Sequence, residues 1–233
     1  MSKIKIMIDP GHGGRDPGAV ANGLVEKDIT LTIAREIREI LLKNYDVLIR
    51  MTRDSDMFVS LEDRARLANS WGADYFISIH INAGGGTGFE SFRHPHAAKH
   101  TGQFQACIHE GILGKITARD RGRKTANYAV LRLTKMAAVL TESYFIDHVE
   151  DSKKLKEASV IKAIATGHVV GLQEMLNLRL INESLTPRPR LVKVYRLLVD
   201  GVQVGAYGER ENVMAQVNQF LDSAKKIEVE RVE

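Results

Sequence analysis

Three side chains in the first third of the chain have the chemistry of a metal site: His12, Glu26 and His80. His12 lies in a glycine-rich turn (residues 10–14) that directly follows an apolar, strand-like run, so the turn would hold the imidazole outward. Two imidazoles and one carboxylate leave the fourth position of a tetrahedral zinc ion open to water, which is the catalytic rather than the structural pattern. We therefore predict a zinc hydrolase.

Each of these residues also has a simpler interpretation. A histidine after a strand is often a hydrogen-bonded structural residue, and His80 fits a core histidine at a strand end. Glu26 could favour the N-terminus of the following helix through its charge. The three together favour the metal site, because His12 and His80 each end a predicted strand of one sheet. Sites in open α/β sheets collect beyond the carboxyl ends of the strands.

Gly11, Gly13 and Gly14 permit close approaches of the backbone that larger residues would obstruct. A phosphate-binding loop is a weaker interpretation, because the stretch lacks both the terminal Gly-Lys-Ser/Thr of a P-loop and the spacing of a dinucleotide fingerprint.

A zinc hydrolase also needs a group that activates water and then protonates the leaving amine. The best candidate is Glu142, a carboxylate placed at the end of the apolar run 137–141. The alternative for Glu142 is a surface carboxylate. Asn82, two positions beyond His80, would share its side of an extended chain and could bind substrate. The alternative for Asn82 is a turn residue.

A second histidine group, His94, His96 and His100, could form another metal site. No carboxylate or cysteine accompanies these residues. We therefore interpret them as loop histidines.

The surrounding sequence alternates strands with helices. Such alternation predicts an α/β fold, with a central mixed, mostly parallel sheet flanked by helices on both faces. Asp28 and Ser60 are the expected N-caps of two helices, the second with Asp63 in the position of a capping box. The predicted strands cover residues 3–9, 46–52, 75–81, 89–93, 129–133 and 137–141, and further helices cover 96–116 and 159–178.

The C-terminal quarter has a different character. Residues 1–180 form the predicted catalytic domain, 181–190 a stiff, Pro-containing basic linker, and 191–233 a small α+β unit. In this unit Asp200-Gly201 predicts a hairpin turn between strands 191–199 and 202–207. A helix over 212–224 and a strand over 226–232 follow. So small a core is marginal alone, which suggests docking or pairing with a second copy.

Composition narrows the class of protein. The chain has 233 residues, 44% hydrophobic and 27% charged, which is ordinary for a globular protein. No apolar run is long enough for membrane insertion, and no secretory signal opens the chain, so we expect synthesis in the cytoplasm. The single Cys107 excludes an intramolecular disulfide and a multi-thiolate zinc site; we expect it to be buried on a helix.

The formal charge of +4 favours a polyanionic partner, either nucleic acid or an anionic cell-wall polymer. The lysines and arginines are spread along the chain and are expected to form solvated faces. No nucleic-acid-binding motif accompanies them, so we predict no nucleic-acid partner.

The sequence resembles the zinc-dependent N-acetylmuramoyl-L-alanine amidases of the type 3 family. The matching blocks are residues 8–14 with 16–19, then 26–27, 78–83 and 139–142. The resemblance implies zinc bound by His12, Glu26 and His80, with Glu142 as the catalytic acid/base. It also implies a mixed sheet flanked by helices, and bacterial peptidoglycan as the substrate. The bond cut would be the amide between N-acetylmuramic acid and the L-alanine of the stem peptide.

The resemblance has one departure and one extension. The family usually has glycine two residues after the catalytic glutamate, whereas this chain has Tyr144, which raises a question about substrate fit near Glu142. Residues 202–207 with Asn212 are similar to part of a sporulation-related (SPOR) repeat, a peptidoglycan-binding module. The overall resemblance extends to phage endolysins and to enzymes that lyse the mother cell after sporulation, and it implies action on the cell wall after release.

Three rival functions follow from the same residues. A zinc peptidase would cut within the stem peptide. A peptidoglycan-binding protein would keep a structural metal site without activity. A basic nucleic-acid binder would rest on net charge alone.

Overall fold

The chain folds as two units, Met1–Asn182 and Glu183–Glu233, and each is described by itself. The computed structural model describes residues 3–181, 194–207, 217, 220–221 and 223–232. The predicted linker 181–190 therefore lies almost wholly outside the described residues. Among the residues described, no helix combines the length and the apolar character needed to cross a bilayer.

The first unit is built on a six-stranded sheet with the order β4-β1-β5-β8-β6-β7. The strands β4, β1, β5 and β8 run parallel, whereas β6 is antiparallel to β8 and parallel to β7. This arrangement confirms the predicted mixed, mostly parallel sheet. The strands are β1 (Ile4–Pro10), β4 (Val47–Met51), β5 (Tyr75–Asn82), β6 (Phe89–Arg93), β7 (Asp120–Thr125) and β8 (Ala137–Phe145).

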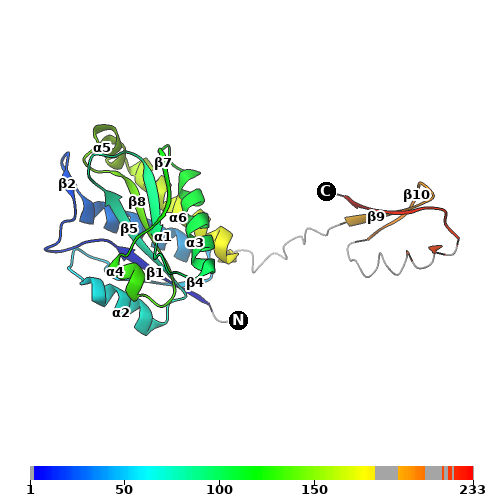
Figure 1. Cartoon of the computed structure of the whole chain (residues 1–233), viewed down its shortest axis with the longest axis horizontal. Coiled ribbons are helices and arrows are strands. Elements are labelled where there is room, and N and C mark those ends of the chain that lie inside the picture. Colours follow the sequence, from blue (N-terminus) through cyan, green and yellow to red (C-terminus); the bar gives the residue numbers. More distant parts are fainter. Residues whose placement is uncertain (1–2, 182–193, 208–216, 218–219, 222, 233) are drawn as a thin grey trace. The chain divides into compact units, whose positions relative to one another are not determined.

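Helices lie on both faces of this sheet (Figure 1). Ile6 and Ile8 of β1 belong to one apolar core, which packs with α1, α3 and α6, while Met7 between them belongs to a second core with α2 and α4. This alternation along β1 is the strand period of two. The helices are α1 (Glu26–Asn44), α2 (Leu61–Trp71), α3 (Lys99–Leu113), α4 (Ala129–Leu133), α5 (Val149–Leu155) and α6 (Ala158–Leu176).

Two local predictions are wrong. Residues 129–133, predicted as a strand, form α4, in which Val130 and Leu131 are buried. A short apolar run does not by itself distinguish a strand from a helix turn. Asp28 is not an N-cap, because α1 begins earlier, at Glu26, with Val25 as its cap. Asp28 instead lies in the first turn, where its charge favours the helix N-terminus.

Other local predictions are confirmed. Ser60 caps α2, accepting a hydrogen bond from the backbone N–H of Asp63. The sole cysteine, Cys107, lies on a helix as predicted, in α3, but its thiol is half-buried rather than buried. Three elements were not predicted: the edge strand β7, the short helix α5, and a hairpin of β2 (Val20–Ala21) with β3 (Leu24–Val25).

The second unit contains an antiparallel sheet with the order β10-β9-β11. Its strands are β9 (Val194–Val199), β10 (Val202–Tyr207) and β11 (Ile227–Val232). Asp200 and Gly201 both have positive φ, at 50° and 82°, as a type I′ hairpin turn requires, so this turn is confirmed. The helix predicted over 212–224 falls mostly outside the described residues.

Candidate metal centre

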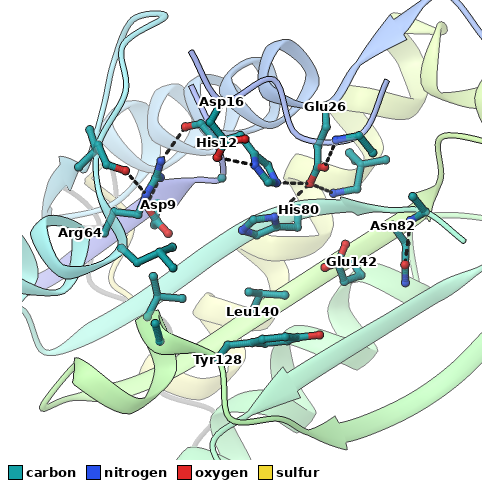
Figure 2. A pocket seen from close by; sticks show the side chains of 18 of the residues that line it. Asp9, His12, Asp16, Glu26, Arg64, His80, Asn82, Tyr128, Leu140 and Glu142 are labelled. Carbon is teal, nitrogen blue, oxygen red and sulfur yellow. Dashed lines mark hydrogen bonds and ion pairs between the residues drawn. The ribbon is translucent and has the colours of Figure 1, made fainter. Parts of the chain in front are cut away.

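The three predicted metal ligands meet at one end of the sheet (Figure 2). His12 follows β1, Glu26 opens α1 and His80 lies in β5. Glu26 Oε1 is 3.1 Å from His12 Nε2 and 3.0 Å from His80 Nδ1. One ligand atom from each residue lies within 4.8 Å of the others, and among the described residues this is the sole such group of histidine, cysteine and acidic side chains.

Glycines make room for this cluster. A Cβ atom on Gly11 would lie 2.3 Å from His80 Cε1, and one on Gly18 would lie 2.6 Å from Glu26 Oε2. His12 itself adopts a left-handed backbone conformation with φ of 61°, which is uncommon outside glycine. The turn is therefore shaped around the imidazoles, at a cost in backbone strain.

The β2–β3 hairpin delivers Glu26 to the site. Its turn residues Asn22 and Gly23 have positive φ, and Asn22 Nδ2 donates a hydrogen bond to the Ile146 carbonyl. Glu26 is 4% exposed, and its two carboxylate oxygens accept hydrogen bonds from the backbone N–H groups of Ala19 and Ile81. Such bonds fix the direction of the carboxylate. The Asn22-Gly23 pair is the sequence signal for this hairpin, which was not among the predicted elements.

A buried ion pair supports the loop that carries His12. Asp9 and Arg64 are both nearly inaccessible, and Arg64 Nη1 lies 2.7 Å from Asp9 Oδ1. Arg64 also donates to the carbonyl oxygens of Pro10 and His12. Arg53 also donates hydrogen bonds to the carbonyl oxygens of Pro10 and Gly11. The carbonyls of the loop are thus bound by two guanidinium groups.

The electrostatics of the cluster favour a cation. Burial would raise the pKa of Glu26, but hydrogen bonds from His12 and His80 hold that pKa well below its usual range. Burial opposes a charged His12, yet the hydrogen bond and negative charge of Glu26, with those of Asp16, raise the pKa of His12. Asp16 Oδ2 lies 2.9 Å from His12 Nδ1, leaving Nε2 turned to Glu26. Two imidazole nitrogens and one carboxylate oxygen are a ligand set that suits zinc. Asp16, which binds the other ring nitrogen of His12, is the kind of partner that orients a zinc-binding histidine.

Glu142 lies beside this cluster on the neighbouring strand. Its register partner on β5 is His80, and its partner on β6 is Glu90. The Oε2 atom of Glu142 is buried and has no hydrogen-bond partner within the described residues. Burial first, and then the charges of Glu26 and Glu90, raise the pKa of Glu142 well above its ordinary value. A carboxyl group with a raised pKa and a free oxygen is suited to exchange a proton.

Asn82 points into the same region but already has partners. Its Nδ2 donates to Glu90 Oε1 at 2.7 Å, and its Oδ1 accepts from the Ala83 N–H. Glu90 also binds Arg121 and Lys124. Glu90 was not predicted, because an acidic residue inside an apolar strand carries no motif. The proposed role of Asn82 in binding substrate stays a prediction.

The cluster and Glu142 line one cavity of about 400 Å³. The apolar part of the lining includes Phe58, Leu61, Tyr128, Val130 and Leu140. Figure 2 shows Tyr128 and Leu140 on the side of the cavity away from His12 and Glu26. A substrate would therefore meet polar groups on one side and apolar surface on the other.

Tyr144, the departure from the family pattern, is absent from the cavity lining. Its φ of 67° is left-handed, which explains why glycine suits this position. The ring is buried, and its hydroxyl donates to the Thr117 carbonyl. Burial and nearby acidic charges raise the pKa of Tyr144 to about 12. The substitution therefore alters the core behind β8 rather than the cavity.

The histidines at 94, 96 and 100 form no metal-binding group. They line a separate hollow of about 200 Å³ with the C-terminal part of α4. His94 contacts Asn127, and its ring centroid lies 5.6 Å from that of His96.

Comparison with known proteins agrees with this geometry. Residues 6–174 match the family model described as N-acetylmuramoyl-L-alanine amidase. The chain is 47% identical over 210 residues to the sporulation-specific N-acetylmuramoyl-L-alanine amidase of Bacillus subtilis, covering 90% of this chain and 77% of that protein. It is 46% identical over 194 residues to the endolysin of Bacillus phage SPP1, covering 81% and 71%. A crystal structure of N-acetylmuramoyl-L-alanine amidase from Clostridium difficile 630 superposes with a TM-score of 0.73 at 32% identity, covering 75% of this chain and 97% of that one.

Proposed function

The chain belongs to the N-acetylmuramoyl-L-alanine amidase family and hydrolyses peptidoglycan, and we propose that it does so with zinc held by His12, Glu26 and His80. The bond cut joins N-acetylmuramic acid to the L-alanine of the stem peptide. One observation carries the assignment of roles: Glu142, whose Oε2 atom is buried and has no hydrogen-bond partner among the described residues, lines the same cavity as the three proposed ligands.

The residues divide the reaction between them. Bound to His12, Glu26 and His80, zinc would polarise the amide carbonyl and acidify water. Glu142 accepts a proton from the attacking water while the oxygen of that water bonds to the carbonyl carbon. Glu142 then donates that proton to the amine of L-alanine as the C–N bond breaks.

Other side chains prepare these groups. Asp16 fixes the ring orientation of His12, because it binds the nitrogen that faces away from Glu26. The apolar wall around Tyr128 and Leu140 excludes water from the far side of the cavity. Exclusion of water keeps the pKa of Glu142 high enough for it to act as an acid in the second step.

The products of peptidoglycan digestion test this proposal. The full chain should release stem peptides with new L-alanine amino termini and leave the glycan strands intact, as mass spectrometry would show. A chelator should stop the release, and added zinc should restore it. A zinc peptidase would instead expose amino termini within the stem peptide. A binding protein would sediment with walls and release nothing.

The remaining proposals concern where the enzyme acts and what residues 191–233 do. We propose that the enzyme acts at the cell wall, where its substrate lies. The SPOR-like assignment of residues 191–233 and their pairing with a second copy are likewise proposals. They are supported by the hairpin at Asp200–Gly201 and by the similarity over 202–207.

A further inference from the structure

The net positive charge of the first unit is concentrated in one segment, although its lysines and arginines are spread along the chain. Residues 91–140 contain nine lysines and arginines but only two acidic residues, Glu110 and Asp120. The segment is basic because acidic residues are scarce there, so a local excess of positive charge accompanies the expected spread of lysines and arginines along the chain. A local excess of one charge attracts ions of the opposite sign more strongly than net charge alone implies.

Five of these nine cations line two neighbouring hollows. One, of about 310 Å³, is lined by Arg93, Arg123 and Lys124, with Gly102, Gln105 and Thr125. The other is the hollow of about 200 Å³ beside α4, which Arg132 and Lys135 line. No aspartate or glutamate lines either one. Consecutive residues line the two hollows at 93–94 and at 101–102, so they lie next to each other.

The cations of these hollows have few acidic partners. Arg132 binds the side-chain and backbone oxygens of Asn127, and within the described residues the Arg93 side chain donates a hydrogen bond only to the His94 carbonyl. Lys135 forms no ion pair within the described residues, and the ion pair of Arg123 with Glu110 is long, at 3.8 Å. Elsewhere in this unit cations have close acidic neighbours, as in Lys27–Asp56 and Arg66–Asp63.

We propose that Arg93, Arg123, Arg132 and Lys135, here called the basic surface, bind the anionic phosphodiester polymer of the bacterial wall. Charge complementarity and the absence of acidic lining favour a chain of repeated anions over a single carboxylate. The wall is the favoured source because the family acts on peptidoglycan, so this step rests on the proposed function. Lys124 is left out because it binds Glu90, beside Glu142.

The position of the basic surface suits this role. Ala129 and Val130 at the start of α4 line the catalytic cavity, whereas Leu131 and Arg132 line the neighbouring hollow. A polymer bound there would hold the cavity close to the glycan without entering it. The interaction would weaken with salt, because exposed charges are screened over about 8 Å at physiological ionic strength.

A matched pair of variants tests the proposal in the full chain. The first carries Arg93→Gln, Arg123→Gln, Arg132→Gln and Lys135→Gln. The control carries Lys43→Gln, Lys153→Gln, Lys156→Gln and Lys162→Gln, all exposed on α1, near or within α5, and on α6. Both lose the same net charge. Sedimentation on ice with walls as isolated, and with walls stripped of phosphodiester polymer by hydrofluoric acid, measures binding.

The wild-type chain and the control should bind intact walls at least several-fold more tightly than stripped walls. The first variant should lose most of that difference, and it should hydrolyse stripped walls at the wild-type rate. Equal losses in both variants would overturn the proposal in favour of net charge. A further outcome would overturn the proposal and assign the surface to nucleic acid. In that outcome an oligonucleotide with the same number of phosphates binds more tightly than the intact wall, and the same four substitutions remove its binding. Failure of the proposed function differs from these results, because neither type of wall would then release stem peptides with L-alanine amino termini.

Discussion

The candidate metal centre and the loop at residues 94–100 each contain three candidate ligands, but only the former has the geometry of a group that could hold a metal ion. At the metal centre, His12 is oriented by Asp16, and Glu26 by two backbone N–H groups. In the loop, His96 and His100 are exposed, and no carboxylate joins them. Proximity of histidines is therefore not sufficient. A site also needs strand ends that converge, glycines that give clearance, and partners that fix each side chain.

The largest expected effect comes from removing a ligand of the metal centre. His80→Ala should reduce bound zinc from about one ion per chain to near none, because two ligands do not hold a catalytic zinc. Peptidoglycan hydrolysis should fall to background. Elemental analysis after dialysis measures the metal, and release of L-alanine amino termini measures activity. Full zinc occupancy in this variant would remove His80 from the site.

Glu142→Gln separates metal binding from proton transfer. This variant should keep its zinc, while turnover falls by roughly 100- to 10,000-fold, the usual contribution of a general acid/base. The same two assays apply, with His80→Ala as the contrasting case. Near-normal turnover would show that another group activates the water.

The support beneath His12 predicts a large effect on stability. Arg64→Leu should reduce the free energy of unfolding by about 3–5 kcal/mol, because it leaves the buried Asp9 carboxylate without its cation. Arg66→Leu, on the same helix, breaks only an exposed pair with Asp63 and should cost less than about 1 kcal/mol. Urea unfolding of both variants measures the difference. Similar costs would contradict a structural role for the buried pair.

The glycine clearance predicts a smaller, local effect. Gly11→Ala forces the His80 ring to shift, which should weaken zinc affinity by about 10- to 100-fold, as loss of an orienting partner does. Gly102→Ala is the control, since the nearest atom to its new Cβ is Arg93 Nε at 3.8 Å. Competition with a metal-sensitive dye compares the two. Unchanged affinity in Gly11→Ala would mean that the ring has room to move.

The smallest effect is expected from the histidine loop. Replacing His94, His96 and His100 together with glutamine should leave zinc content unchanged, because the three form no metal-binding group. Loss of one zinc ion per chain in this triple variant would show that the histidine loop also binds a metal, and the contrast between the two regions would not hold.

The sequence predicted the parts of this molecule that depend on local pattern. The candidate ligands could be found because each lies in a short motif at a strand end or helix start, and the fold because strands and helices alternate. Glu90 could not be found, since its importance comes from its place beside Glu142 across β6 and β8. The helix at 129–133 was missed because tertiary burial of Val130 and Leu131, not periodicity, determines it. The left-handed backbone of Tyr144 became visible only in the structure, although the glycine of the family pattern pointed to it.

Anomalous diffraction at the zinc absorption edge, on crystals of the full chain grown with zinc, tests the central claim most directly. We expect one strong peak bonded to His12 Nε2, His80 Nδ1 and the Glu26 carboxylate, with Glu142 facing its open side and no peak at residues 94–100. A strong peak at residues 94–100 with none between His12 and His80 would contradict the account.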